Sequence, residues 1–473
     1  MKYYDSPVDF ILDRATTTPS KYAVIDTIGR SKTYYELLRD ASWGAYKLQE
    51  LGVEAGSKVA VALRNTVDSV TLLYSIWLAG STAVVIDPLS FAEDIRMQFE
   101  ESKPNLFIVE DRDRDTLCST SKEVECTSIS RVLSREGETV RETYYRPRAW
   151  DEILVFFYAG VVGRTTEVIH TASSTVATAV LTAKHYEFSE EDTIWATPPL
   201  SHLMGLGLSL LSSHVVGATS LLYARFKKVE PSEAVELAHK YKPSIIVAAP
   251  QLYQILLQGG FKGYKELRFS ISGGAPLPKH SLEEWRRRTN TDILQVYGMT
   301  EAAPVAGTKL GDNPEGSIGK PVNGVEVKIV DPEDTSRLAS GPGELLVRGP
   351  IVMKRYHDEE DTARAITSSG WLCTGDIIEE VNGYLYFRGV RKRMIKYKGY
   401  PIFPRDLEIV LEKHPAVVKA EVYGENAGEH GQVPVAKVWV ERGARVSEKE
   451  LVEWVNTRVA PYKKIRKIHI EYS

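Results

Sequence analysis

The chain has 473 residues, of which 43% are hydrophobic and 26% charged, and its formal net charge is −4. This length predicts two or more domains, and the composition is typical of a globular protein, which excludes the disordered and fibrous classes. A chain with this charge has no basic footprint for nucleic acid. The three cysteines, Cys118, Cys126 and Cys373, argue against a disulfide framework, so we expect a reducing, cytoplasmic compartment.

Helical and strand patterns alternate through the first half of the chain. Residues 34–51 carry apolar side chains at helical spacing up to Gly52, a residue that favours the end of a helix. Short apolar runs between turn signals predict buried strands. The further predicted elements are strands 59–63, 83–86, 106–109 and 245–248 and helices 67–79, 232–241 and 251–258. Strands that alternate with helices indicate parallel sheets covered by helices on both faces.

Residues 205–224 carry no formal charge and are the one stretch that resembles a membrane span. Gly207, Ser212 and Gly217 interrupt the stretch. We therefore expect a buried helix followed by a buried strand, and no membrane span.

The pattern changes after Gly316. Residues 325–330 and 343–348 alternate between apolar and polar side chains, which predicts half-buried antiparallel strands in a small β-barrel-like part. After Gly389, the predicted elements are helix 404–413, strands 417–423 and 433–440, and helix 448–459. We therefore expect an α/β chain with a large N-terminal domain at 1–390, containing parallel helix-covered sheets, and a small α+β domain at 391–473.

Six loop segments lie where these patterns change, which is where ligand-binding residues concentrate in α/β proteins. They are residues 158–167, 198–202, 272–277, 297–301, 370–376 and 396–401. Their order and content resemble the superfamily of acyl-CoA synthetases, luciferases and peptide-synthetase adenylation domains, and the resemblance covers nearly the whole chain. It implies an enzyme that activates a carboxylic acid with ATP as an acyl-adenylate and then transfers the acyl group to a thiol such as coenzyme A.

The resemblance also implies a nucleotide site. The small residues Gly273, Gly274 and Ala275 follow a predicted strand and would let adenine approach the backbone, although an ordinary tight turn would have the same composition. Tyr297 would stack on adenine. Asp376 would accept both ribose hydroxyls, because a carboxylate suits a vicinal diol, and its alternative role is that of a turn residue.

Phosphate handling is implied for two further segments. Thr300 would bond a phosphate and Glu301 would hold Mg²⁺, because a hard cation prefers oxygen ligands. The alternative for this pair is the N-cap of a helix. Gly160 and Gly163 would shape the phosphate-binding loop. ATP or AMP, Mg²⁺ and coenzyme A are thus the implied ligands.

Acyl and thiol recognition are carried over in the same way. His202 would form a wall of the acyl pocket, or be a core histidine with satisfied hydrogen bonds. Gly298 stands where acetate-specific relatives place tryptophan, so we expect open space there and an acid larger than acetate. Lys398 and Gly399 would form the thiol tunnel. Lys392 stands at the family's hinge, where the small domain would turn between adenylation and thioester formation.

The phosphate-binding segment departs from the family pattern Ser/Thr-Gly-Thr-Thr-Gly-x-Pro-Lys-Gly. Val161 and Val162 replace hydroxyl residues, Thr166 replaces the lysine, and Glu167 adds a negative charge near the expected polyphosphate. Arg164 and the hydroxyls of Thr165 and Thr166 are expected to compensate only in part, because such a loop positions its donors within fractions of an ångström. Losing three or four charge-assisted hydrogen bonds from a transition state costs about 5–10 kcal/mol, or about 10⁴ to 10⁷ in rate.

Two more departures lie toward the C-terminus. Relatives continue into a Pro-Lys-x-x-Ser-Gly-Lys stretch, whereas this sequence ends at Ser473 before such a stretch. Val390 stands where relatives place an arginine that touches ribose, with Arg391 one residue later. Two functions therefore stay open: an acid–CoA ligase whose partners are a carboxylic acid and CoA, or a homologue that binds AMP, acyl-AMP or acyl-CoA and performs at most the thioester half-reaction.

Overall fold

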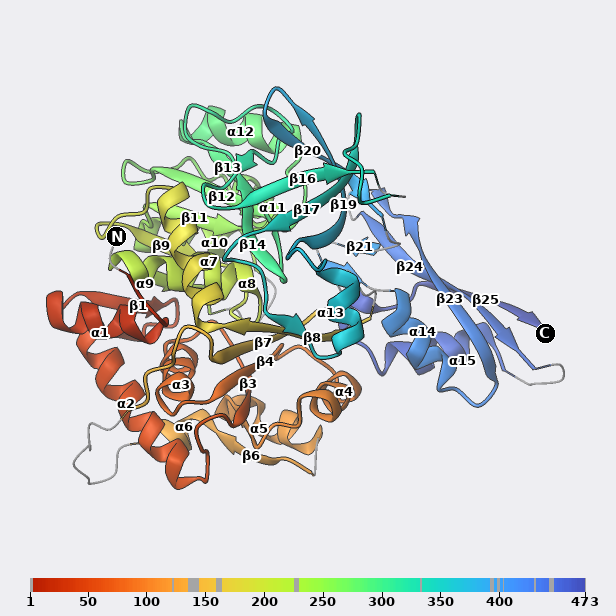
Figure 1. The fold of residues 1–473 in the computed structure, drawn as a ribbon, viewed down its shortest axis with the longest axis horizontal. Helices are drawn as coiled ribbons and strands as arrows, with labels where there is room; N and C mark the ends of the chain where they lie inside the picture. Colours follow the sequence, from red (N-terminus) through yellow and green to blue (C-terminus); the bar gives the residue numbers. More distant parts are fainter. Residues whose placement is uncertain are drawn as a thin grey trace.

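The computed structural model of the chain describes most of the residues. The described ranges are 3–120, 123–134, 144–158, 164–224, 229–331, 334–391, 395–397, 400–402, 404–428, 431–441 and 446–472. Two large sheets with their helices form the main body, and the C-terminal elements lie to one side of it (Figure 1).

The first large sheet has seven strands in the order β18-β8-β7-β4-β3-β5-β6. Their bounds are β3 (Lys58–Ala62), β4 (Thr82–Ile86), β5 (Leu106–Val109), β6 (Glu125–Ser128), β7 (Glu152–Tyr158), β8 (Thr166–Thr171) and β18 (Arg355–Tyr356). The strands β3 to β7 run parallel, whereas β8 and β18 pair antiparallel at one edge. The strand β8 begins at Thr166, within the last residues of the expected phosphate-binding segment 158–167.

The second large sheet has nine strands in the order β15-β14-β13-β12-β11-β9-β10-β1-β2. Their bounds are β1 (Tyr22–Asp26), β2 (Ser31–Thr33), β9 (Thr193–Ala196), β10 (Thr219–Leu222), β11 (Ile245–Ala248), β12 (Phe269–Gly273), β13 (Ile293–Met299), β14 (Ala302–Gly307) and β15 (Lys320–Pro321). The six central strands are parallel and the outer strands pair antiparallel.

Helices cover both sheets and fill the space between them. They are α1 (Val8–Thr17), α2 (Tyr34–Glu50), α3 (Val67–Leu78), α4 (Ala92–Ser102), α5 (Arg114–Leu117), α6 (Ile129–Leu133), α7 (Ala172–His185), α8 (Leu203–Gly205), α9 (Ser212–Val216), α10 (Pro231–Tyr241), α11 (Pro250–Gln258), α12 (Lys279–Thr289) and α13 (Glu359–Ala365). Every residue of α3 except Asp68 is buried, because this helix is apolar on nearly all sides and belongs to the core cluster that joins the two sheets.

The uncharged stretch 205–224 folds as the sequence predicts. A buried helical run from α8 through the π-helical segment Leu206–Leu211 to α9 precedes the buried strand β10. Within the described residues, no helix has the length and apolar character that crossing a membrane requires.

The C-terminal part contains two kinds of sheet. A four-stranded antiparallel sheet is formed by β16 (Glu326–Val330), β17 (Gly343–Arg348), β19 (Leu372–Val381) and β20 (Tyr384–Val390). Beyond it lie β21 (Ile395–Tyr397), β22 (Tyr400–Ile402), α14 (Pro404–Glu412), β23 (Val417–Asn426), β24 (Gln432–Val440), α15 (Glu448–Asn456) and β25 (Lys467–Tyr472). The predicted fold class is confirmed: parallel sheets, a small antiparallel part and a C-terminal α+β unit.

The C-terminal unit has its own apolar core, made of residues between Ile395 and Ile468. It contacts the main body at the first turn of α4 (Figure 1). Lys413 Nζ lies 2.6 Å from Glu93 Oε1, and Lys463 Nζ lies 3.8 Å from Asp94 Oδ1. The orientation of the C-terminal unit in this structure is therefore held in part by ion pairs to one helix.

The cysteines differ from the expectation. Cys118 and Cys126 form a disulfide, with their Cα atoms 5.5 Å apart, while Cys373 is a free, half-buried thiol. The first two cysteines come together because a short helical turn after α5 leads back into β6. The argument against disulfides from the cysteine count was therefore wrong for this pair.

Candidate active site

Tyr297 and Asp376 meet although they belong to different sheets. Tyr297 is in β13 of the nine-stranded sheet and Asp376 is in β19 of the antiparallel sheet. The Tyr297 hydroxyl donates to Asp376 Oδ2 at 2.7 Å. Burial, followed by the charge of Asp376, raises the pKa of Tyr297 well above its ordinary value, so the phenol stays protonated and remains a donor. Asp376 is thus a strand residue, and its alternative role as a turn residue is wrong.

Tyr158 belongs to the same cluster, and sequence reasoning gave it no role. It ends β7, and burial raises its pKa, with smaller contributions from the carboxylates of Glu301 and Asp376. We call Tyr158, Tyr297, Glu301 and Asp376 the tyrosine–carboxylate cluster. Tyr158 is the first residue of the phosphate-binding segment 158–167, but no local sequence pattern links it to Glu301 and Asp376.

Thr300 and Glu301 form the turn between β13 and β14. The Glu301 side chain is fully buried, and its Oε1 accepts a hydrogen bond from the Tyr356 hydroxyl. The Thr300 carbonyl oxygen lies 2.8 Å from Nε2 of His170, whose pKa is lowered to about 4 by burial. Because this turn joins two antiparallel strands, the alternative of a helix N-cap is wrong.

The donor set around Glu301 fits one kind of metal ion. Among the described residues there is no group of three or more His, Cys, Asp or Glu side chains that could hold a metal. A single carboxylate suits Mg²⁺, which keeps several water ligands and takes the rest from substrate phosphates. Glu301 would hold such an ion, whose charge would offset that of the phosphates.

Gly273, the last residue of β12, and Gly274, directly after it, are glycines for different physical reasons. A Cβ atom at Gly273 would lie 2.6 Å from Val296 Cγ1, so the close packing of β12 on β13 requires a glycine. Gly274 has a φ of +78°, and a Cβ there would meet no atom within 4 Å. The backbone at Gly274 is therefore open on the side where a flat ligand could approach, next to the half-buried Ala275.

Gly298 does not border open space, which corrects the expectation from the sequence. A Cβ atom there would lie 2.7 Å from Ala303 Cβ and 3.1 Å from the Ala302 carbonyl oxygen. The β13–β14 turn brings these atoms close. The glycine is required by the close approach of the two strands, so it carries no argument about the size of the acid.

His202 is not a core histidine. Its side chain is 43% exposed, and its Nε2 lies 3.6 Å from Asp87 Oδ2. Burial opposes ionisation of Asp87, but the hydrogen bond and charge of His202 outweigh it and hold the pKa of Asp87 below its ordinary value. Asn65, which sequence reasoning missed, fixes the preceding loop: its side chain donates to the Pro198 carbonyl at 3.0 Å and accepts from the Leu200 amide at 2.8 Å.

Several predicted site residues lie outside the described residues. They are Gly160, Gly163, Lys392, Lys398 and Gly399. Arg391, directly before the expected hinge, pairs with Glu344 at 2.5 Å.

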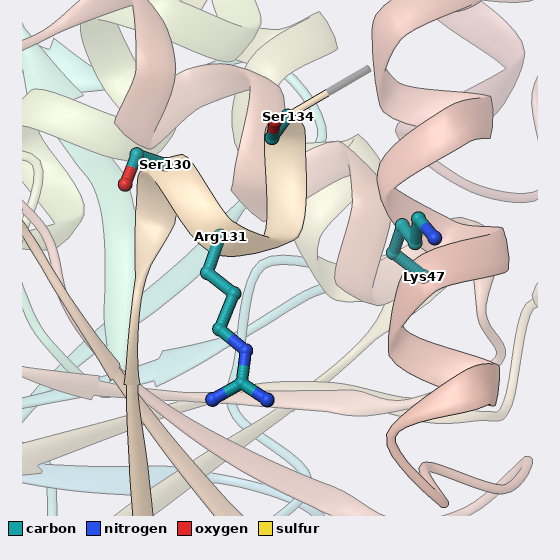
Figure 2. Close-up of a pocket in the computed structure, with 4 residues that line it drawn as sticks. All are labelled: Lys47, Ser130, Arg131 and Ser134. Atoms are coloured by element: carbon teal, nitrogen blue, oxygen red, sulfur yellow. The ribbon is translucent and has the colours of Figure 1, made fainter. Parts of the chain in front are cut away.

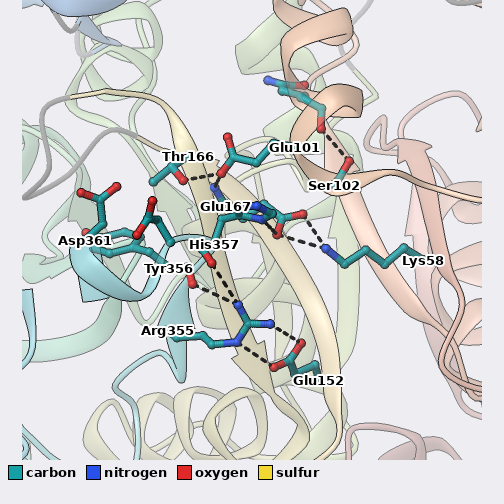
Figure 3. A network of polar contacts seen from close by, with 12 residues as sticks. Lys58, Glu101, Ser102, Glu152, Thr166, Glu167, Arg355, Tyr356, His357 and Asp361 are labelled. Carbon is teal, nitrogen blue, oxygen red and sulfur yellow. Dashed lines mark hydrogen bonds and ion pairs between the residues drawn. The ribbon is translucent and has the colours of Figure 1, made fainter. Parts of the chain in front are cut away.

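The last residues of the phosphate-binding segment 158–167 already have partners within the protein, and Figure 3 shows those of Thr166 and Glu167. Arg164 pairs with Asp361 of α13, and the Thr166 hydroxyl donates to Glu101 of α4. Glu167 is fully buried. The Thr166 hydroxyl therefore donates to a carboxylate of the protein, and the Arg164 guanidinium is paired with another.

The sequence predicted that Glu167 would place a negative charge near the polyphosphate, and its contacts correct this expectation. Lys58 Nζ lies 2.8 and 3.0 Å from its two carboxylate oxygens, and His357 Nδ1 lies 3.0 Å from Oε2 (Figure 3). A buried carboxylate needs such partners, because desolvation of an unpaired charge is costly. The negative charge at this position is thus compensated within the protein.

A separate surface hollow of about 390 Å³ lies between α2 and α6 (Figure 2). It is lined by Lys47 of α2 and by Ser130, Arg131 and Ser134 at and after α6. None of the predicted site residues lines this hollow, so we do not assign it to the active site.

Comparisons with known proteins agree with the arrangement of these segments. 4-Coumarate–CoA ligase-like 6 of Arabidopsis thaliana is 30% identical over 481 residues, covering 94% of this chain and 84% of the relative. The o-succinylbenzoate CoA synthetase of Bacillus subtilis is 26% identical and covers 98% of this chain and 94% of its own. Its TM-score to this chain is 0.85 in a double mutant bound with the product analogue OSB-NCoA, and 0.72 in the complex with AMP.

Two family models match separate parts of the chain. Residues 11–357 match the AMP-binding enzyme family, and residues 406–471 match the AMP-binding enzyme C-terminal domain. Because the first match alone spans well over half of the sequence, the chain belongs to the family of AMP-binding enzymes and carries the C-terminal domain of that family.

Proposed function

We propose that the chain is an acid–CoA ligase that activates a carboxylic acid with ATP as acyl-adenylate and transfers the acyl group to coenzyme A. The observation that carries this proposal is the Tyr297–Asp376 hydrogen bond, which brings an aromatic ring and a carboxylate from two sheets beside the open backbone at Gly274. Kinship to a CoA ligase over 94% of the chain supports the reaction class.

The nucleotide would lie between the nine-stranded sheet, which carries Tyr297, and the four-stranded antiparallel sheet, which carries Asp376. Adenine would rest against the backbone of Gly274 and Ala275 and the ring of Tyr297, and the ribose hydroxyls would donate to Asp376. Thr300 would contact the α-phosphate, and Glu301 would hold Mg²⁺ beside it. A ribose on Asp376 would share this carboxylate with the Tyr297 hydroxyl, so Tyr297 would hold the acceptor in place before the nucleotide arrives.

We further propose a mobile small domain at 391–473, with its hinge at Lys392 and the thiol channel at Lys398 and Gly399. The separate core between Ile395 and Ile468 supports an independent unit. The higher TM-score to the relative with a CoA product analogue than to the same relative with AMP supports an orientation suited to thioester formation.

The acid is proposed to be aromatic and larger than acetate. The relatives carry the names of 4-coumarate and o-succinylbenzoate ligases, and both acids contain a benzene ring. His202 and Asp87 would form a polar part of the acyl pocket, on a loop fixed by Asn65.

A second candidate function is favoured by the contacts of Arg164 and Thr166. Thr166 donates its only hydroxyl proton to Glu101, and Arg164 is drawn toward Asp361, so we infer that the two side chains do not fully make up for the lysine and hydroxyls missing from the phosphate-binding segment. We therefore propose that adenylation is slow, while thioester formation from a supplied acyl-adenylate is retained.

The test is the comparison of two half-reactions. Acid-dependent ATP–pyrophosphate exchange is measured with a panel of aromatic and aliphatic acids, and acyl-CoA formation is measured from the matching acyl-adenylates. We expect weak exchange, strongest with an aromatic acid, and clear thioester formation. Rapid exchange would contradict the second candidate and support a full ligase, whereas failure of both half-reactions would contradict a ligase.

A further inference from the structure

The last turn of α4 places a carboxylate against the start of β8. Glu101 Oε1 accepts hydrogen bonds from the Thr166 hydroxyl and from the backbone amide of Glu167, the latter at 2.9 Å. The side chains of Thr166 and Glu167 are both fully buried. Figure 3 shows Glu101 and Thr166 directed toward each other at the end of the strand. One carboxylate oxygen thus fixes two consecutive residues.

The contact between Glu101 and Thr166 matters because of the place of residue 166 in the phosphate-binding segment. Residue 166 stands where the family pattern has the lysine of the phosphate-binding segment. Here the residue is a threonine, and its single hydroxyl proton is donated to Glu101. The side chain at 166 is therefore committed to the protein and does not point to a phosphate.

Glu167 is fixed from the opposite side. Lys58 of β3 and His357, which follows β18, hold its carboxylate at 2.8 to 3.0 Å. The His357 amide also donates to the Glu167 carbonyl oxygen at 3.2 Å. Contacts from α4, β3 and the residue after β18 therefore hold the start of β8, where the phosphate-binding segment ends.

We propose that Glu101 is a positioning residue for adenylation: acting through Thr166 and the Glu167 amide, it fixes the start of β8, where the phosphate-binding segment ends. This inference rests on the proposed function. It has a specific consequence, because a lysine introduced at position 166 would form an ion pair with Glu101. Such a lysine would be captured by the protein and would not reach a phosphate unless Glu101 were neutralised.

The experiment combines E101Q, T166K and the double variant T166K/E101Q in the full chain. Affinities for MgATP and for AMP are measured by calorimetry, and acid-dependent ATP–pyrophosphate exchange is measured alongside. We expect E101Q to weaken MgATP about tenfold while AMP changes less than twofold, because only the polyphosphate depends on the segment. T166K alone should not raise exchange, whereas the double variant should raise it at least tenfold over T166K. E100Q, an equal charge change at the exposed neighbouring residue, is the matched control.

Two smaller variants keep the inference testable if T166K does not fold. T166V removes the donor to Glu101 and should weaken MgATP as E101Q does, whereas T166S keeps a hydroxyl and should restore the affinity. Equal losses of MgATP and AMP affinity in E101Q would show a merely structural role and overturn the inference, as would an increase in exchange with T166K alone. Unchanged MgATP affinity in E101Q beside normal AMP binding would overturn it while leaving the proposed function intact. Absence of AMP binding by the unmodified chain would overturn both.

Discussion

Asp376 is the residue on which nucleotide recognition is proposed to depend most. Its carboxylate accepts from Tyr297 at 2.7 Å and lies near the buried phenol of Tyr158. A charged acceptor that serves two ribose hydroxyls makes stronger hydrogen bonds than a neutral one, typically by a factor of about two.

We predict that Asp376→Ala weakens AMP about ten- to a hundredfold, because hydrogen bonds to a charged group contribute roughly 1.5–3 kcal/mol. Calorimetric titration with AMP measures the change. Tyr297→Phe keeps the ring but loses the bond to Asp376, and should weaken AMP by less than tenfold. Equal AMP affinity in the wild type and the Asp376 variant would show that the ribose is bound elsewhere.

Two buried histidines predict how stability depends on pH. Burial lowers the pKa of His170 and of His214 to about 4 each. The unfolded chain binds these protons near pH 6.5, so stability is lost as the pH falls from about 6.5 to about 4, by up to roughly 3 kcal/mol for each group. Urea unfolding between pH 7.5 and 5 measures the slope. His214→Phe should reduce it, and an unchanged slope would mean that His214 takes up its proton normally in the folded state.

At the scale of elements, the sequence predicts features that depend on neighbouring residues but not those that depend on distant contacts. The start of α2 is readable, because Thr33 and Glu36 form a capping box at the spacing that identifies it. The role of the acidic residues of α4 cannot be predicted from local spacing, because their partners lie far along the chain. Glu93 pairs with Lys413, and Glu101 accepts a hydrogen bond from a residue 65 positions away. Sequence spacing holds no information about such packing.

The same distinction applies to the site. Tyr297 and Asp376 could be named from the order of family motifs, and the structure brings them together. Tyr158 and Asn65 could not, because each acts through a contact with residues far along the chain. Gly298 was misread, since a missing side chain in the sequence does not distinguish open space from a close approach of backbone.

The buried Glu167 tests the packing of β8 on its neighbours. Lys58→Met leaves this carboxylate with His357 as its remaining side-chain partner, and we predict a loss of up to roughly 3 kcal/mol. This loss is at the low end of the range for a broken buried ion pair, because the Lys58 side chain is 24% exposed and solvent weakens the interaction. Guanidinium unfolding measures the change. The double variant Lys58→Met with Glu167→Gln should recover part of it, and a single variant as stable as wild type would show that water replaces Lys58.

At the scale of the whole molecule, the ion pair between Lys413 and Glu93 links the C-terminal unit to α4. Its hydrogen bond from Lys413 lowers the pKa of Glu93, although burial opposes this. Exposed pairs contribute about 0.2–1 kcal/mol, so the pair biases the orientation of the unit without fixing it.

We predict that Glu93→Lys slows acyl-CoA formation from acyl-adenylate about two- to fivefold and leaves ATP–pyrophosphate exchange unchanged. The reason is that repulsion from Lys413 disfavours the orientation proposed for thioester formation. Lys413→Glu should act alike, and the charge-swapped double variant should regain the rate. High salt should reduce every difference. If the swap fails to restore the rate, or if both half-reactions fall together, the pair does not control orientation.

The three hydrogen-bonding contacts of Asn65 have a consequence for how new substrates could be accommodated. This side chain follows β3 of the first sheet, yet it binds backbone atoms of Ala196, which ends β9 of the second sheet, and of Pro198 and Leu200, which follow β9. The loop that carries His202, which we propose as a wall of the acyl pocket, is therefore held by residues of both large sheets. Substitutions in the loop can exchange side chains without moving the backbone, because its path is dictated from the opposite sheet. A change in the acid that such an enzyme accepts would therefore come from new side chains on a loop whose backbone stays in place. A substitution of Asn65 would shift that backbone and would weaken the binding of all acids alike.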